Sequence, residues 1–60
     1  MDYYVKGGWR GQSTNSGEYW RDCSSVNEAI EKSRKHHSHD SREWYVVEVR
    51  ENNANGRKVY

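Results

Sequence analysis

The chain has no Leu, Phe or Pro and only one Cys, and these absences limit what it can be. A single cysteine cannot form an internal disulfide, which excludes the disulfide scaffolds common among small secreted domains and favours the cytoplasm. No apolar run approaches the roughly 18 residues of a membrane span. Residues 1–6 also lack the features of a secretory signal. We expect a soluble, cytoplasmic protein with no membrane partner.

Missing aliphatic residues also leave little material for a core. Hydrophobic residues are 32% of the 60, below the usual range of about 45–50%, and 32% are charged, so disorder is one interpretation. Against it, the net charge is only +1, and three Trp and five Tyr residues can bury large areas. We expect one ordered domain over residues 1–60. A core this small can also require a partner, including a second copy of the chain.

Alternation of apolar and polar side chains predicts the strands. The predicted strands are residues 3–10, 18–23 and 43–50, with a polar loop at 11–17, a turn at 52–56 and a short charged edge strand at 57–60. Within the first strand, Gly7-Gly8 indicates a bulge or a close backbone approach.

Ser25-Val26-Asn27-Glu28 matches a capping box, in which a Ser side chain and a Glu side chain each accept a hydrogen bond from a backbone N–H. A helix is therefore predicted from this point to about His37. Its buried stripe would hold Val26, Ala29, Ile30 and Ser33.

These elements predict an α+β fold of the ββαβ type, with a possible fourth edge strand. The sheet is antiparallel in the order 2-1-3-4 if the third strand pairs with the first. One helix covers one face. Besides the helix stripe, the core would then contain Tyr3, Val5, Tyr19 or Cys23, Tyr45, Val47, Val49 and Val59.

Imidazole, carboxylate and thiolate ligands for zinc occur in the run His36-His37-Ser38-His39-Asp40 and at Cys23. No second ligand pair stands at zinc-finger spacing, and histidines at a helix end commonly cap the last carbonyls. Cys23 lacks any sign of an orienting base and is better interpreted as a small core residue. We expect no catalytic residue, no metal and no cofactor, and hence a protein that is not an enzyme.

The most informative feature is the sheet face that one helix leaves uncovered. On the predicted alternation, it carries an aromatic and arginine set: Tyr4, Trp20, Trp44, Val46, Arg10 and Arg50. Such residues are enriched at protein-binding hot spots, which favours docking of another protein on this face or at an edge strand. Two alternatives stay open: the tryptophans form a second small core, or the face stacks the bases of single-stranded nucleic acid. The near-neutral charge favours protein over nucleic acid.

Three stretches carry a resemblance to a known group of proteins. They are the aromatic strand Tyr3–Trp9, the helix start Val26-Asn27-Glu28-Ala29-Ile30-Glu31 and the valine-rich strand Tyr45-Val46-Val47-Glu48-Val49. The pattern resembles very small phage-encoded host-takeover proteins, such as inhibitors of bacterial RNA polymerase. The resemblance implies an inhibitor or modulator of a host protein, and it assigns no functional residue.

Overall fold

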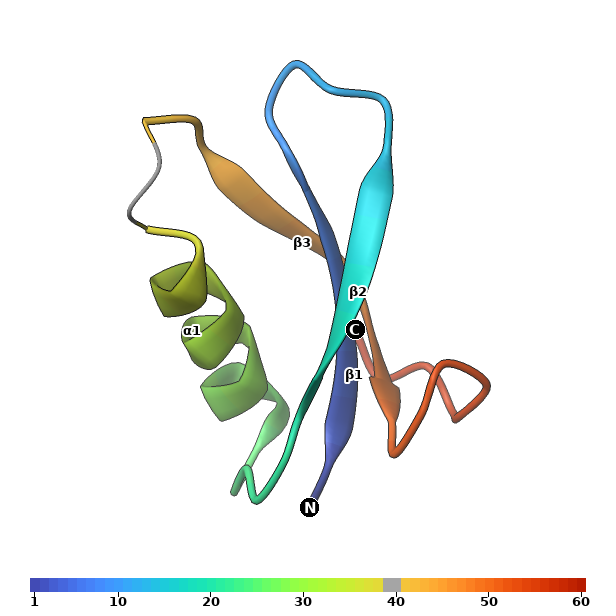
Figure 1. Cartoon of the computed structure of the whole chain (residues 1–60). Helices are drawn as coiled ribbons and strands as arrows, with labels where there is room; N and C mark the ends of the chain where they lie inside the picture. Colours follow the sequence, from blue (N-terminus) through green and yellow to red (C-terminus); the bar gives the residue numbers. More distant parts are fainter. Residues whose placement is uncertain (39–40) are drawn as a thin grey trace.

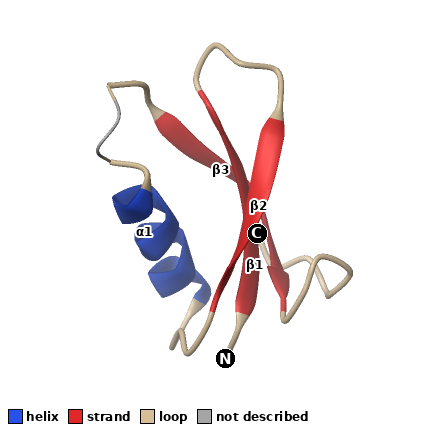
Figure 2. Cartoon of the chain, viewed as in Figure 1, coloured by secondary structure: helices blue, strands red, loops and turns tan. Residues whose placement is uncertain are grey.

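One antiparallel sheet and one helix make up the fold in the computed structural model, which describes residues 1–38 and 41–60. The elements are β1 (Tyr3–Trp9), β2 (Asn15–Trp20), α1 (Val26–His36) and β3 (Trp44–Glu51). The sheet order is β2-β1-β3, with both neighbours antiparallel to the central strand, and α1 lies on one side of the sheet (Figures 1 and 2). The predicted α+β class and strand order are confirmed.

The C-terminal segment lies along the outer edge of β3. The backbone N–H of Val59 donates to the Val49 carbonyl at 2.8 Å, and that of Glu51 donates to the Arg57 carbonyl at 2.9 Å. Only one isolated bridge, between Arg50 and Lys58, has the geometry of strand pairing. Residues 57–60 therefore run along the edge of β3 without forming the possible fourth strand, and the sheet has three strands.

Helix α1 begins where the capping pattern predicts. Ser25 is the N-cap, and its Oγ accepts from the backbone N–H of Glu28 at 3.1 Å. The Glu28 carboxylate accepts from the N–H of Ser24 at 2.6 Å, one residue earlier than the pattern implies. Ala29, Ile30 and Ser33 are buried as predicted. Among the described residues, no helix has the length and apolarity to cross a membrane.

The hydrophobic core lies between α1 and the sheet. Its buried members are Tyr3, Val5, Cys23, Ala29, Ile30 and Val49, and Trp20, Val26, Val46 and Val59 pack against them. The Cys23 side chain is almost fully enclosed, at 1% exposure, which agrees with its interpretation as a small core residue.

A β-bulge in β3 reverses which side chains of that strand face the helix. Lys6 pairs with Glu48, whereas Gly7 pairs with Val46, so Val47 has no partner on β1. Because a strand presents alternate residues to its two faces, one extra residue exchanges the faces on one side of the bulge.

Trp44 and Val46 therefore lie on the helix side, and their predicted placement on the uncovered face was wrong. The predicted burial of Tyr45 and Val47 was also wrong: they are 39% and 40% exposed.

The faces of β2 also differ from the prediction. Trp20 pairs with the core residue Tyr3, and Tyr19 pairs with Tyr4. Trp20 consequently packs against the core, while Tyr19 is 55% exposed. The predicted position of Trp20 on the uncovered face was wrong, because strand β2 begins at Asn15 and adjacent aromatic residues leave its alternation undetermined.

Candidate functional site

The residues predicted to form one binding surface are divided between the two faces of the sheet. Tyr4 and Arg50 pair across β1 and β3 and share the uncovered face. Trp20, Trp44 and Val46 lie on the helix side. Arg10 follows the end of β1, where its exposed guanidinium contacts the Glu43 carboxylate at 3.0 Å. Trp20 packs against the main core and Trp44 contacts the buried Ser33 of α1, so the two tryptophans do not form a separate second core and the open face is left to other residues.

Trp44 is held on the helix side by three contacts. Its indole Nε1 donates to the Oγ of the buried Ser33 at 3.0 Å. The His37 ring stacks on it, with centroids 3.7 Å apart, and Trp9 meets it edge-on at 5.1 Å. A Cβ at Gly7 would lie 2.7 Å from Trp44 Cζ2, so the ring packs directly on the glycine backbone. The close approach predicted at Gly7-Gly8 is therefore the packing of the Trp44 ring on the Gly7 backbone.

Next to these rings, a carboxylate from β2 meets two imidazoles at the end of α1. The Nε2 of His37 lies 2.6 Å from Glu18 Oε1, and the Nε2 of His36 lies 3.4 Å from Glu18 Oε2. The three ligand-capable atoms lie within 4.8 Å of one another. Trp20 meets the His36 ring edge-on at 5.5 Å. We call Glu18, His36 and His37 the Glu–His–His cluster; the histidine pair was noticed in the sequence and its carboxylate was not.

The uncovered face carries three tyrosines, one from each strand, which we call the open-face tyrosines: Tyr4, Tyr19 and Tyr45. Tyr4 and Tyr19 pack edge-on with centroids 5.1 Å apart. A Cβ at Gly17 would overlap the Tyr4 ring, so this glycine leaves room for the ring to lie across the sheet. Tyr45 pairs with Gly8, on the same face as Tyr4. The sequence predicted Tyr45 in the core and left Tyr19 and Cys23 as alternatives there; Cys23 is the buried one.

Arg50 has an internal role on that face. Its Nε and Nη2 donate to the Glu48 carboxylate at 2.9 and 3.3 Å, and its Nη1 donates to the Gly56 carbonyl at 2.9 Å. These hydrogen bonds lower the pKa of Glu48 and raise the pKa of Arg50. The ion pair joins β3 to the following turn and places a carboxylate among the open-face tyrosines.

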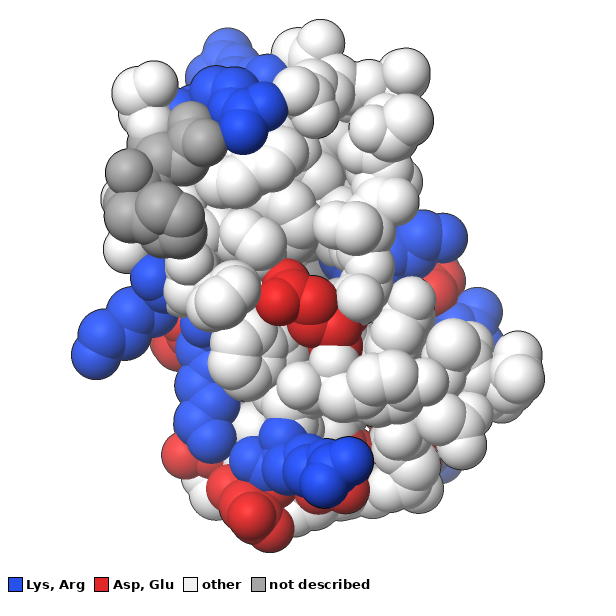
Figure 3. Space-filling view, in the orientation of Figure 1, with Lys and Arg blue, Asp and Glu red and all other residues white. Residues whose placement is uncertain are grey.

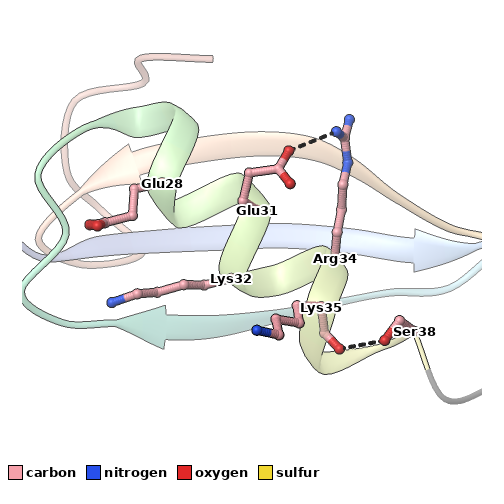
Figure 4. Close-up of a pocket in the computed structure, with 6 residues that line it drawn as sticks. All are labelled: Glu28, Glu31, Lys32, Arg34, Lys35 and Ser38. Carbon is pink, nitrogen blue, oxygen red and sulfur yellow. Dashed lines mark hydrogen bonds and ion pairs between the residues drawn. The ribbon is translucent and has the colours of Figure 1, made fainter.

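Charge is mixed elsewhere on the surface. In the view of Figure 3, Lys and Arg side chains are interleaved with Asp and Glu side chains over the lower part of the molecule. A shallow hollow on the outer side of α1 is lined by side chains of both signs (Figure 4): Glu28, Glu31, Lys32, Arg34, Lys35 and Ser38. Within it, Arg34 pairs with Glu31 at 3.2 Å. This hollow is an ordinary solvated helix surface.

The fold is a small α+β domain. One sheet face is open and carries the tyrosines, and the Glu–His–His cluster lies on the other side, between β2 and the C-terminal end of α1. No family model, curated protein or solved structure matches the chain. The open-face tyrosines and the Glu–His–His cluster are therefore the features that bear on function. His39 and Asp40 of the predicted histidine run lie outside the described residues.

Proposed function

We propose that this chain is a small, non-enzymatic protein-binding module that docks another protein on its open sheet face. The observation that carries the proposal is the set of open-face tyrosines, of which Tyr19 is 55% and Tyr45 39% exposed. Tyrosine offers a large rigid contact area with a polar tip, and it is enriched at binding hot spots. In a chain this poor in apolar residues, three tyrosines on one face need a reason beyond chance exposure.

Electrostatics favours a protein over a nucleic acid on this face. A single-strand binder needs cations free to meet phosphates beside its stacking rings. Here Arg50 is held by Glu48 and Gly56, and the Glu48 carboxylate pairs across the strands with Lys6 on the same face, so positive charge there is balanced by a carboxylate. Trp20 and Trp44, the rings proposed for stacking, pack on the helix side. A protein surface tolerates mixed charge around aromatic anchors, which matches this arrangement.

The resemblance to phage host-takeover proteins makes a bacterial cytoplasmic protein the first partner class to test. A double variant, Tyr19→Ser with Tyr45→Ser, removes the two exposed rings of the face. The matched control, Tyr60→Ser, removes a ring that is 52% exposed near the C-terminus. Circular dichroism melts of all three proteins establish that folding is retained.

Affinity capture from bacterial lysate, followed by purified-partner titration, tests the proposal. We expect the wild type and the Tyr60→Ser control to bind one protein with equal affinity, and the double variant to bind at least about 30-fold more weakly, as loss of a hot spot of about 2 kcal/mol implies. Equal binding by all three would refute the open face as the docking surface. A mobility shift with single-stranded oligonucleotides that is lost steeply with salt would favour the nucleic-acid alternative instead.

A self-complementary version of the same proposal is a homodimer through the open face. Sedimentation equilibrium distinguishes it, because the wild type would then be dimeric and the double variant monomeric. A wild type that stays monomeric at high concentration would exclude the homodimer, and the partner would then be a different protein.

A further inference from the structure

We propose that the Glu–His–His cluster is a binding site for a transition-metal dication of the zinc class. Two imidazoles and one carboxylate are a ligand set that proteins use for Zn²⁺ sites with an open fourth position. The set comes from two separate elements: Glu18 from β2, and His36 and His37 from the end of α1. The sheet pairing places Glu18 opposite Val5, on the helix side, which is why this carboxylate reaches the helix end.

The three ligand-capable atoms lie within 4.8 Å of one another, and a tetrahedral ion would draw them to about 3.3 Å, so side-chain adjustment accompanies binding. Ligands at about 2.0–2.2 Å from zinc stand about 3.3 Å apart from one another. The His36 Nε2 and Glu18 Oε2 atoms are already 3.4 Å apart. The His37 Nε2 and Glu18 Oε1 atoms, now 2.6 Å apart, must separate by about 0.7 Å as the metal replaces the shared proton.

Both imidazole rings are oriented by aromatic neighbours, of which Trp44 and Trp20 lie outside the ligand set. His37, only 14% exposed in its side chain, stacks on Trp44, whose Nε1 is fixed by the buried Ser33. His36 lies edge-on against Trp20 and edge-on against His37. Such outer contacts pre-orient ligands and raise affinity, because less side-chain freedom is lost on binding.

Solvent access and local charge also fit a cation. The His36 side chain is 55% exposed and that of Glu18 is 30% exposed, so an ion can enter and keep a water in the fourth position. The site lies at the C-terminal end of α1, where the helix dipole is negative. Imidazole ligands select zinc-class ions over Mg²⁺, which prefers oxygen ligands.

Calorimetric titration of the tag-free chain with ZnCl₂ measures the binding directly, and Co²⁺ reports the coordination through its visible absorption. We expect one ion per chain, tetrahedral Co²⁺ bands and no response to millimolar Mg²⁺. Glu18→Gln, His36→Ala and His37→Ala each remove a direct ligand and should weaken Zn²⁺ binding by about 100-fold or more, because changes to the outer contacts of ligands alone cost about 10–100-fold. The matched control, Glu31→Gln on the outer face of α1, should bind Zn²⁺ as the wild type does.

Thermal melting gives a second reading that is independent of the variants. Zn²⁺ at 100 times its Kd should raise the midpoint of the wild type by about 11–22 °C, because the ion binds only the folded chain and joins β2 to α1. The absence of Zn²⁺ binding and of a midpoint shift in the wild type would overturn the proposal. Equal Zn²⁺ binding by wild type, Glu18→Gln and His36→Ala would overturn it as well, since the ion would then lie elsewhere.

Discussion

Replacing Trp44 by Ala tests directly whether this side chain packs on the helix side of the sheet. If the ring packs under the helix, its loss removes the stack with His37, the contact over Gly7 and the hydrogen bond to Ser33. Removing a core Trp ring costs about 3–5 kcal/mol. A chain of 60 residues has a free energy of unfolding of only about 3–9 kcal/mol, so this one substitution should take away a third of it or more.

Urea denaturation followed by far-ultraviolet circular dichroism is the appropriate assay, because removal of a Trp also alters fluorescence. With a slope of about 1 kcal/mol per molar urea for a small domain, the transition midpoint should fall by about 3 M or the variant should be unfolded without urea. A free energy of unfolding within about 0.5 kcal/mol of the wild type would refute the packing, since surface substitutions have effects of that size.

A double-mutant cycle isolates the hydrogen bond from the ring. Trp44→Phe keeps an aromatic ring but leaves the Ser33 hydroxyl without its donor, and Ser33→Ala leaves the indole N–H without its acceptor. Each single change should cost about 1–3 kcal/mol, and the double variant should cost less than their sum by about 1 kcal/mol. Additive costs would show that the two side chains do not interact.

Three further outcomes follow from the same structure. Gly7→Ala should lower the free energy of unfolding by about 1–3 kcal/mol in urea titrations, because its Cβ would lie 2.5 Å from the Tyr45 carbonyl oxygen and 2.7 Å from the Trp44 ring; an unchanged value would refute both contacts. Ser25→Ala should cost about 1 kcal/mol through loss of the helix cap, whereas Ser24→Ala should cost almost nothing, since only the Ser24 backbone N–H is used; equal thermal midpoints would contradict the cap. The hydrogen bond from Arg50 lowers the pKa of Glu48, so the stability that Glu48 contributes is present above the ordinary pKa of 4.5 and is lost as pH falls through the lower pKa of the folded state. A Glu48→Gln variant should therefore lose less stability than the wild type as acid is added in thermal melts. Parallel curves would argue against the pairing.

The sequence was sufficient for the elements because their signals are local. The Ser25 cap and the stripe of Ala29, Ile30 and Ser33 are properties of one helix turn after another. The strand order depended on a condition, the pairing of the third strand with the first, which joins distant residues and which the structure supplies.

The faces of the strands could not be predicted, because they depend on register. Gly7-Gly8 correctly indicated a bulge, but the extra residue is Val47 on the opposite strand, where no glycine marks it. One unpaired residue moved Trp44 from the open face to the core and Tyr45 from the core to the surface. In β2, the adjacent aromatics Tyr19 and Trp20 fit either face equally well until the pairing with β1 is known.

The same shortage of aliphatic residues that limits the core also explains the Glu–His–His cluster. With no Leu or Phe available, the space between the end of α1 and the sheet is filled by rings: Trp9, Trp44 and His37. An imidazole differs from a phenyl ring in carrying two nitrogens that must find partners when they are enclosed. Glu18 supplies a partner from β2 for the Nε2 of each ring, and this places a carboxylate and two imidazoles around one point. A metal ion at that point would enter an existing contact through side-chain adjustment, and it would leave the open-face tyrosines on the opposite side untouched.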